Sequence, residues 1–109
     1  MRSFDLYGYK DDHTLTQFVS EVEKLLKVAF EIHNSYYRGG DYYIYNFNNN
    51  ENVIIQTNYN KIEKEFTEPV FKDFKVLIYV NYTIRLSEIH NIFAESIPTL
   101  KLLSKKTIE

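Results

Sequence analysis

The sequence predicts an α+β domain in which an antiparallel sheet of about four strands has helices packed mainly on one face. Segments in which apolar and polar residues alternate, typical of strands, are mixed with two segments whose apolar residues recur every three to four positions, typical of amphipathic helices. Each predicted helix has one apolar stripe and can therefore cover the sheet on one side only. No repeat, linker or change of composition divides residues 1–109. We expect one domain with the order β-α-β-β-β-α.

The first strand and the first helix are predicted before residue 33. Ser3 to Tyr9 alternates in the manner of a strand. Thr14 and Gln17 fit a capping box that starts a helix running to about Ile32. Its apolar positions form one stripe, made of Leu15, Phe18, Val19, Val22, Leu25, Leu26 and Ala29. Asn34 and Ser35 are expected to follow the end of this helix.

The middle of the chain predicts three strands. Gly39-Gly40 supplies a turn that tolerates positive φ, and the segments 41–47 and 53–59 then form a hairpin. Tyr43, Tyr45 and Phe47 share one face of the hairpin and are expected to contribute to the core. A polar stretch leads to Pro69, and residues 74–83 give the strongest strand pattern. The sheet face without helices is expected to be the more exposed, with several tyrosines on it.

A second helix is predicted near the C-terminus. Ser87 is its expected N-cap, and the apolar stripe consists of Ile89, Ile92, Phe93 and Ile97. Pro98 should end or kink this helix. Residues 99–106 are predicted to form a short final helical piece.

Composition narrows the classes of function. With a net charge of −2 at pH 7, the chain lacks the lysine and arginine surplus with which nucleic-acid binders contact phosphate. It has no cysteine, so disulfides and zinc–thiolate sites are ruled out. No stretch approaches the roughly 20 apolar residues that span a bilayer, and the first residues do not resemble a signal peptide. We expect a cytoplasmic protein without a cofactor that contacts neither membranes nor nucleic acid.

No arrangement of residues predicts catalysis. The serines lie outside the motifs of known nucleophilic sites, and the three histidines lack the spacing of helical metal ligands. His13 beside Asp11 and Asp12 comes closest to a metal site, and we interpret it as a solvated helix start. Glu63 and Glu65 lie in a polar stretch, whereas acid–base catalysis needs a carboxyl in a pocket of low dielectric. We predict that the chain is not an enzyme and holds no metal.

The excess of aromatic residues is the strongest functional signal. The chain has ten tyrosines and eight phenylalanines, and five of the tyrosines fall between residues 36 and 45. Tyrosine and arginine are enriched at the energetic centres of protein interfaces, although tyrosine also suits strands and cores. The predicted contact residues on this segment are Tyr36, Tyr37, Arg38, Asp41 and Tyr42. Acidic residues predicted to join them against a basic partner are Asp11, Asp12, Glu63, Glu65 and Glu68.

Three segments together resemble a known family. They are residues 36–45, the Ile55–Tyr59 strand with the acidic linker after it, and Glu68–Phe74 leading into Val76–Val80. Their arrangement is similar to small bacterial immunity proteins of contact-dependent growth inhibition and related polymorphic-toxin systems. The resemblance implies a cytoplasmic antitoxin that binds one cognate toxin domain, often a nuclease, and masks its active site.

Two other functions remain open from the sequence. The chain could bind a small ligand or act as an enzyme through a pocket between sheet and helices. It could also be a homo-oligomeric module whose exposed tyrosines pair with those of another copy, although we favour a monomer.

Overall fold

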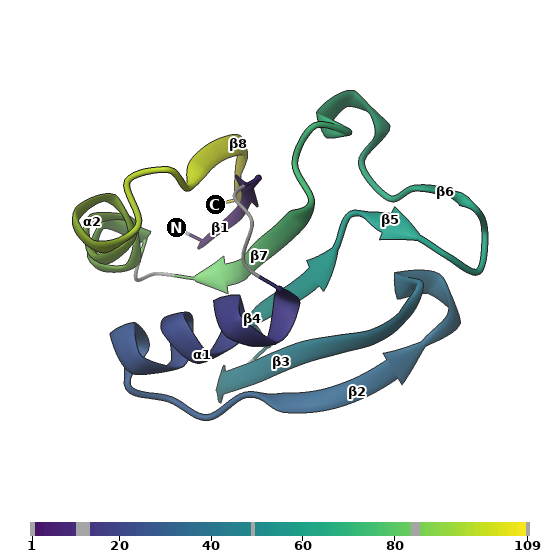
Figure 1. Cartoon of the computed structure of the whole chain (residues 1–109). Coiled ribbons are helices and arrows are strands. Elements are labelled where there is room, and N and C mark those ends of the chain that lie inside the picture. The colour runs from purple at the N-terminus through teal and green to yellow at the C-terminus, as the bar shows by residue number, and fades with distance from the viewer. Residues whose placement is uncertain (1, 11–13, 49, 84–85, 109) are drawn as a thin grey trace.

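The computed structural model describes residues 2–10, 14–48, 50–83 and 86–108. Six strands form the main sheet in the order β2-β3-β4-β7-β1-β8, and every neighbouring pair is antiparallel (Figure 1). The strands are β1 (Arg2–Tyr9), β2 (Glu31–Ser35), β3 (Gly40–Asn48), β4 (Glu51–Thr57), β7 (Val76–Thr83) and β8 (Lys101–Ile108). A second sheet pairs β5 (Tyr59–Asn60) with β6 (Glu65–Phe66). The predicted α+β class with an antiparallel sheet is confirmed, whereas the expected number of strands and their order are corrected.

The first helix is shorter than the sequence predicted: it ends at Leu26 instead of near Ile32, and the residues from Glu31 to Ser35 form β2. The predicted capping box of Thr14 and Gln17 is present at the start of α1 (Leu15–Leu26). Lys27 then adopts a left-handed conformation with φ of 57°. The carboxylate of Glu23 accepts a hydrogen bond from the Phe30 N–H at 2.7 Å. Because this contact turns the chain away from the helix axis, residues from 31 onward are free to pair with β3.

The C-terminal segment is also a strand instead of the predicted helical piece. The second helix, α2 (Leu86–Ser96), ends just before Pro98, as expected. Ser87 lies inside this helix and is therefore not its N-cap. The Leu100 N–H donates to the Ile97 carbonyl at 3.0 Å, which turns the chain back along the sheet. β8 then pairs with β1, whose other neighbour is β7.

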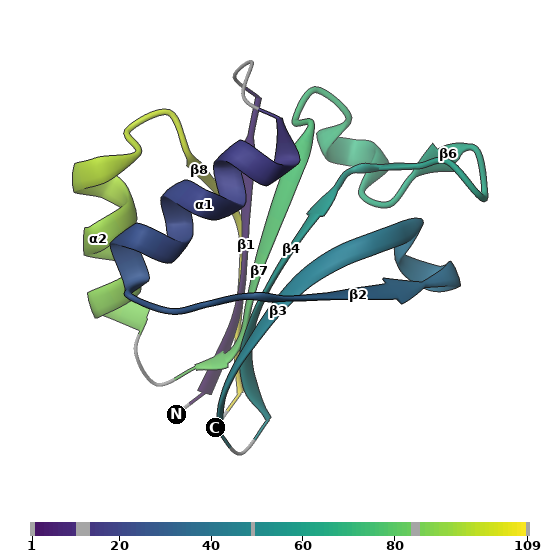
Figure 2. The same ribbon diagram turned by 60° about the horizontal axis from the view of Figure 1, so that its bottom comes forward.

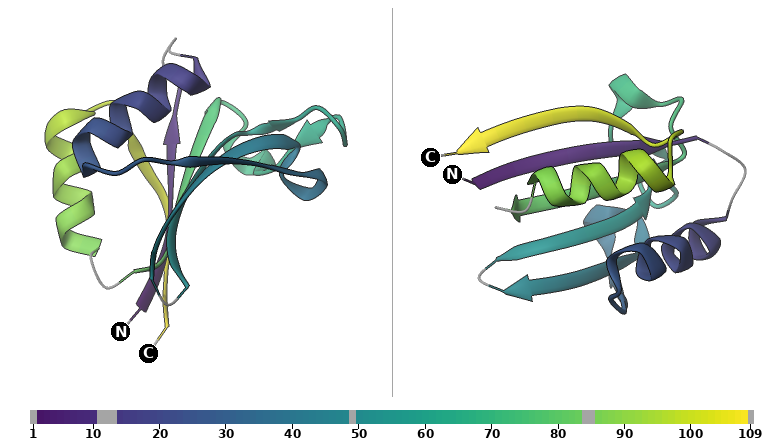
Figure 3. Two further views of the ribbon diagram at one scale, coloured as in Figure 1. Left: turned by 90° about the horizontal axis from the view of Figure 1, so that it is seen from below. Right: turned by 90° about the vertical axis from the view of Figure 1, so that its left-hand side faces the viewer.

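Both helices pack on one face of the sheet (Figures 2 and 3). The core between them contains alternate residues of three strands and the apolar stripes of the helices. Its buried members are Tyr7, Tyr9, Val53, Ile55, Val76, Ile78 and Val80 from the sheet, and Phe18, Val19, Val22, Ile89, Phe93 and Ile97 from the helices and the residues that follow. Tyr43 and Phe47 pack against this cluster. The predicted one-sided packing is confirmed, and so is the core role of Tyr43 and Phe47, whereas the Tyr45 ring lies against Phe30 and Phe47.

The opposite face is less exposed than the sequence predicted. Leu77 and Gln56 are fully buried on it, because the segment between β4 and β7, with η2 (Pro69–Phe71), lies on that side of the sheet (Figure 2). A Cβ atom on Gly8 would lie 2.6–2.7 Å from side-chain atoms of Leu103 and Phe74, so both residues pack directly over β1. β7 begins at Val76, two residues later than the strand predicted over residues 74–83, and Phe74 lies outside it.

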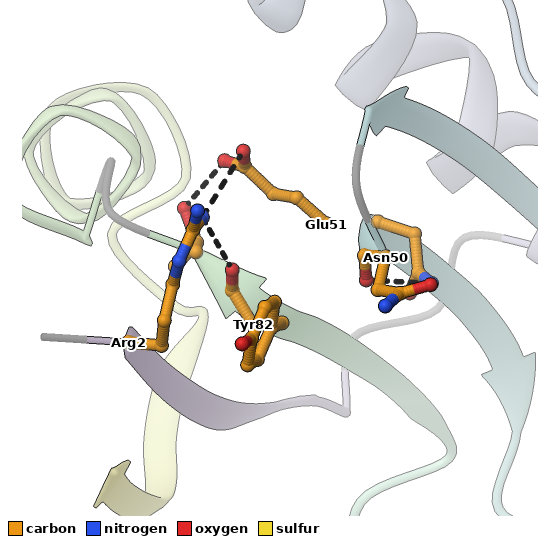
Figure 4. A network of polar contacts seen from close by, with 6 residues as sticks. Arg2, Asn50, Glu51 and Tyr82 are labelled. Atoms are coloured by element: carbon orange, nitrogen blue, oxygen red, sulfur yellow. Dashed lines mark hydrogen bonds and ion pairs between the residues drawn. The ribbon is translucent and has the colours of Figure 1, made fainter. Parts of the chain in front are cut away.

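A buried polar network holds together one end of the sheet (Figure 4). Glu51 at the start of β4 is buried and accepts a hydrogen bond from the Thr83 hydroxyl at 2.9 Å. The Arg2 guanidinium lies 4.0 Å from the Glu51 carboxylate and donates to the Tyr82 carbonyl at 3.2 Å. These contacts join β1, β4 and β7. The charged groups of Arg2 and Glu51 therefore contact each other and other groups within the fold.

Candidate partner-binding surface

The tyrosine-rich segment forms a short 3₁₀ helix, η1 (Tyr36–Arg38), between β2 and β3. Gly39 follows it with φ of +81°, a conformation that favours glycine. A Cβ atom at Gly39 would lie 3.0 Å from the Cα atom of Asn60. Glycine therefore satisfies both the turn and the close approach of η1 to β5, and the predicted positive φ at this turn is confirmed.

Asn58 fixes the segment that leads from β4 to β7. Its side chain is fully buried. The amide nitrogen donates to the carbonyls of Phe71 at 3.0 Å, Phe74 at 3.1 Å and Glu68 at 3.4 Å, and the amide oxygen accepts from the Glu68 N–H at 2.9 Å. One side chain thus replaces the backbone partners that this irregular segment lacks.

Asn60 organises the acidic part of the same segment. Its side-chain oxygen accepts hydrogen bonds from the N–H groups of Ile62 and Glu63, each at 2.9 Å. Such asparagine-centred turns are typical of loops whose backbone donors need a local acceptor. The turn holds Glu63 close to η1.

The structure brings four of the predicted contact residues to one surface, which we call the η1 surface and define as Tyr36, Tyr37, Glu63 and Glu65. Tyr37 lines the same hollow as both glutamates. The hydrogen bond between Tyr36 and Glu63, together with the negative charge of that carboxylate, raises the pKa of Tyr36. Tyr36 is 56% exposed and Tyr37 is 87% exposed. Two segments far apart in the sequence, one aromatic and one acidic, therefore meet in an exposed position.

Three further predicted residues lie next to this surface, on the sheet face away from the helices. Arg38 donates to the side-chain oxygen of Gln56 at 2.6 Å, and its guanidinium lies 5.3 Å from the ring centre of Tyr42 and 5.6 Å from that of Tyr79. The Tyr79 hydroxyl donates to the Glu68 carboxylate at 3.0 Å. Burial and the Glu68 charge raise the pKa of Tyr79, while Arg38 opposes the shift. Arg38, the last residue of η1, thus forms a partly buried layer with Tyr42 and Glu68 that connects η1 to the sheet.

The remaining predicted residues are not shown to join the η1 surface. Asp41 accepts a hydrogen bond from the Asn34 side chain at 3.1 Å, across the pairing of β2 and β3. By the alternation of a strand, it faces the opposite side of β3 from Tyr42. Asp11 and Asp12 lie outside the described residues.

Sequence reasoning missed the residues that build this surface from within. Asn58, Asn60 and Gln56 are buried polar residues, but in the sequence the asparagines cannot be told from those of a solvated loop. Phe66, in β6, lines the same hollow as Tyr37. No spacing pattern identifies Gln56 and Asn58, because their partners Arg38, Phe71 and Phe74 come from other parts of the chain.

Asp5 is a second feature that the sequence did not reveal. It lies on the helix-covered face of β1 and is only 2% exposed. Burial raises the pKa of this carboxyl, and Lys105, His90 and Ser3 offset the shift only in part. Burial and the Asp5 charge also raise the pKa of Tyr7 to about 12. A separate hollow between sheet and helices, lined by Tyr9 and Phe18 and not by Asp5, has a volume of about 40 Å³, which is room for a few water molecules at most.

Metal sites, membrane-spanning helices and similarity to known proteins are three further possible indications of function. Within residues 2–10, 14–48, 50–83 and 86–108, no group of three or more histidine, aspartate or glutamate side chains is placed to hold a metal ion. Neither of the described helices has the length and apolar character needed to cross a membrane. No protein-family model, curated protein or solved structure matches the chain.

Proposed function

We propose that this chain is an immunity protein that binds a cognate toxin domain, a nuclease, and blocks its active site by occupying it. The observation that carries this proposal is the meeting of exposed tyrosines with Glu63 and Glu65 on the η1 surface. The family resemblance of residues 36–83 supports the assignment of the partner as a toxin. The proposal needs no reaction by this chain, only a stable complex.

The chemistry of the η1 surface suits a nuclease as the partner. A nuclease active site binds phosphate and therefore presents positive charge. Glu63 and Glu65 offer carboxylates to such a site, while Tyr36 and Tyr37 offer large rings that bury area at little cost in side-chain entropy. Complementary charge also speeds the encounter of two proteins, which favours an inhibitor that must act before its target does.

The rigidity of the surface supports the same function. The η1 helix is fixed by its close approach to Asn60, and Glu63 is fixed by the turn that Asn60 caps. A surface that is already ordered loses less conformational freedom on binding. We therefore expect a tight complex without a large rearrangement of this chain.

Co-expression with the protein encoded immediately upstream tests the proposal. The chain should rescue growth of cells that produce that protein, and the two should elute together in size-exclusion chromatography. Light scattering in the same run should report one copy of each protein. Absence of a complex, or a homo-oligomer of this chain that leaves the upstream protein active, would contradict the proposal.

A single substitution locates the contact. Tyr37→Ala should weaken the complex by about 2 kcal/mol or more, which is roughly 30-fold in Kd. Its melting temperature should stay unchanged, because Tyr37 is almost fully exposed. Ile32→Ala on β2 is the matched control, since Ile32 is also an exposed large apolar residue. Equal effects of the two substitutions on affinity would place the contact elsewhere.

A further inference from the structure

The η1 surface contains a hollow between η1 and the hairpin of β5 and β6. Its volume is about 360 Å³, which falls within the range of about 300–1,000 Å³ found for ligand pockets. The residues that line it are Tyr37, Asn60, Glu63, Glu65, Phe66 and Thr67. No basic side chain is among them.

The two carboxylates of this hollow have no cationic partner. Glu63 and Glu65 take part in neither of the ion pairs found among the described residues, which join Arg2 to Glu51 and His33 to Glu31. Arg38 follows Tyr37 directly in the chain, but its guanidinium is engaged with Gln56 and the rings of Tyr42 and Tyr79. Within the part of the chain that the structure describes, no ion pair therefore neutralises the carboxylates of this hollow.

Aromatic rings stand beside these carboxylates. Tyr37 is braced by Tyr36, whose ring meets it edge to face with centres 5.9 Å apart. Phe66 is braced by Tyr59 in the same way at 5.2 Å. The face of an aromatic ring attracts cations, and a planar guanidinium can stack on such a ring while it donates two parallel hydrogen bonds to a carboxylate. A compact ammonium can make the first contact but not the paired hydrogen bonds.

The backbone around the hollow is fixed before any ligand binds. Asn60 caps the turn that carries Glu63, and the Thr67 N–H donates to the Asn58 carbonyl at 2.7 Å. Both walls of the hollow are therefore attached to buried asparagines. A cation entering it meets a backbone that is already in place.

We propose that this hollow receives one arginine side chain of the partner protein, with the guanidinium stacked on Tyr37 and hydrogen bonded to Glu63 or Glu65. This inference rests on the proposed function, since it names the group of the partner that the η1 surface recognises. In a nuclease, such an arginine would be one that otherwise contacts phosphate. The hollow would then mask it directly.

A titration followed by NMR tests the hollow without the partner. The probes are the peptide acetyl-Gly-Arg-Gly-amide and the same peptide with citrulline, which has the size and shape of arginine without its charge. The arginine peptide should shift the amide signals of Glu63, Glu65 and Thr67 in a saturable manner. The citrulline peptide should shift them little, and added salt should weaken the arginine effect because it screens exposed charges.

Charge-removing variants complete the test. Glu63→Gln combined with Glu65→Gln should weaken binding of the arginine peptide by at least about fivefold. Asp73→Asn is the control, because Asp73 is an exposed acid that does not line the hollow, and it should leave binding unchanged. Equal binding of the citrulline peptide, or full binding by the double variant, would overturn the inference.

The two proposals fail in different ways. If the complex with the upstream protein forms normally with the double variant, the arginine site is wrong and the proposed function stands. If the arginine peptide binds as expected but no complex with the upstream protein forms, the site stands and the proposed partner is wrong.

Discussion

Replacing Asn58 with alanine should destabilise the fold and loosen the η1 surface. Three of the hydrogen bonds made by this side chain are 3.1 Å or shorter. At about 1 kcal/mol net for each, their loss amounts to about 3 kcal/mol. Because a domain of this size has a total stability of about 5–15 kcal/mol, this is a large fraction. The Phe74 carbonyl would also lose the Asn58 donor, and the Phe71 carbonyl would keep only the Phe74 N–H.

Urea unfolding followed by circular dichroism measures this loss, and Asn46→Ala is the matched control. Asn46 is an exposed asparagine on β3, so its replacement should change the free energy of unfolding by less than about 0.5 kcal/mol. Amide hydrogen exchange adds a local measurement. The Glu68 N–H, which donates to the Asn58 side chain, should exchange much faster in Asn58→Ala.

Asn58→Asp sharpens the same test. An ionised carboxylate keeps the acceptor for the Glu68 N–H but directs an oxygen towards carbonyls that need a donor. At neutral pH this variant should therefore be at least as unstable as Asn58→Ala, and it should recover partly in acid, where the protonated carboxyl can donate. A loss below about 1 kcal/mol in both variants, with unchanged exchange at Glu68, would refute the role given to Asn58.

Two further predictions concern the helix-covered side of the molecule. The folded state raises the pKa of Asp5 above its ordinary value of 3.8, so the stability associated with this group is complete below pH 3.8 and is lost as pH rises through the folded pKa. Asp5→Asn should therefore melt at a higher temperature than the natural chain at neutral pH, with a gap that closes in acid; a gap independent of pH would contradict burial as the cause. Lys27→Gly should stabilise the fold by about 0.5–1 kcal/mol in thermal unfolding, because φ at Lys27 is 57° and glycine adopts this conformation without strain. Lys24→Gly, inside α1, should cost about 1 kcal/mol, and a similar effect of both substitutions would show that the helix end is not strained.

The sequence predicted most of the elements that are determined by residues close together in the chain. The β3–β4 hairpin, the strong strand near Val76–Thr83, the capping box of α1 and the end of α2 before Pro98 all follow from alternation or from the chemistry of a single turn. The end of α1 does not, because Ala29 continues the helical stripe of Leu25 and Leu26 beyond Lys27. A left-handed lysine held by contacts of Glu23 overrides that pattern.

The two edge strands could not be predicted for a different reason. Residues 31–35 are all at least partly exposed, and residues 101–107 are mostly exposed, so neither segment shows the alternation of a half-buried strand. Each is a strand because a neighbour, β3 or β1, offers an unpaired edge. These unpaired edges exist only in the assembled sheet, so the sequence of the edge strand itself does not reveal them.

The candidate surface divides in the same way. Tyr36, Tyr37 and the glutamates could be selected from the sequence, because a tyrosine-rich segment and an acidic polar stretch are visible in its composition. Their meeting could not, since it depends on Gly39 approaching Asn60 and on Asn58 bonding to a distant segment. These are long-range contacts made by residue types that are ordinary in any loop.

The position of β1 has a consequence for synthesis. This strand is made well before both of its partners, β7 and β8, which come from residues 76–108. In a growing chain on the ribosome, β1 therefore has no strand to pair with until residues 76–108 have emerged. Sheets that pair such distant segments form slowly, and their folding intermediates expose apolar surface that favours aggregation. We expect this chain to gain more from a chaperone during translation than its small size suggests.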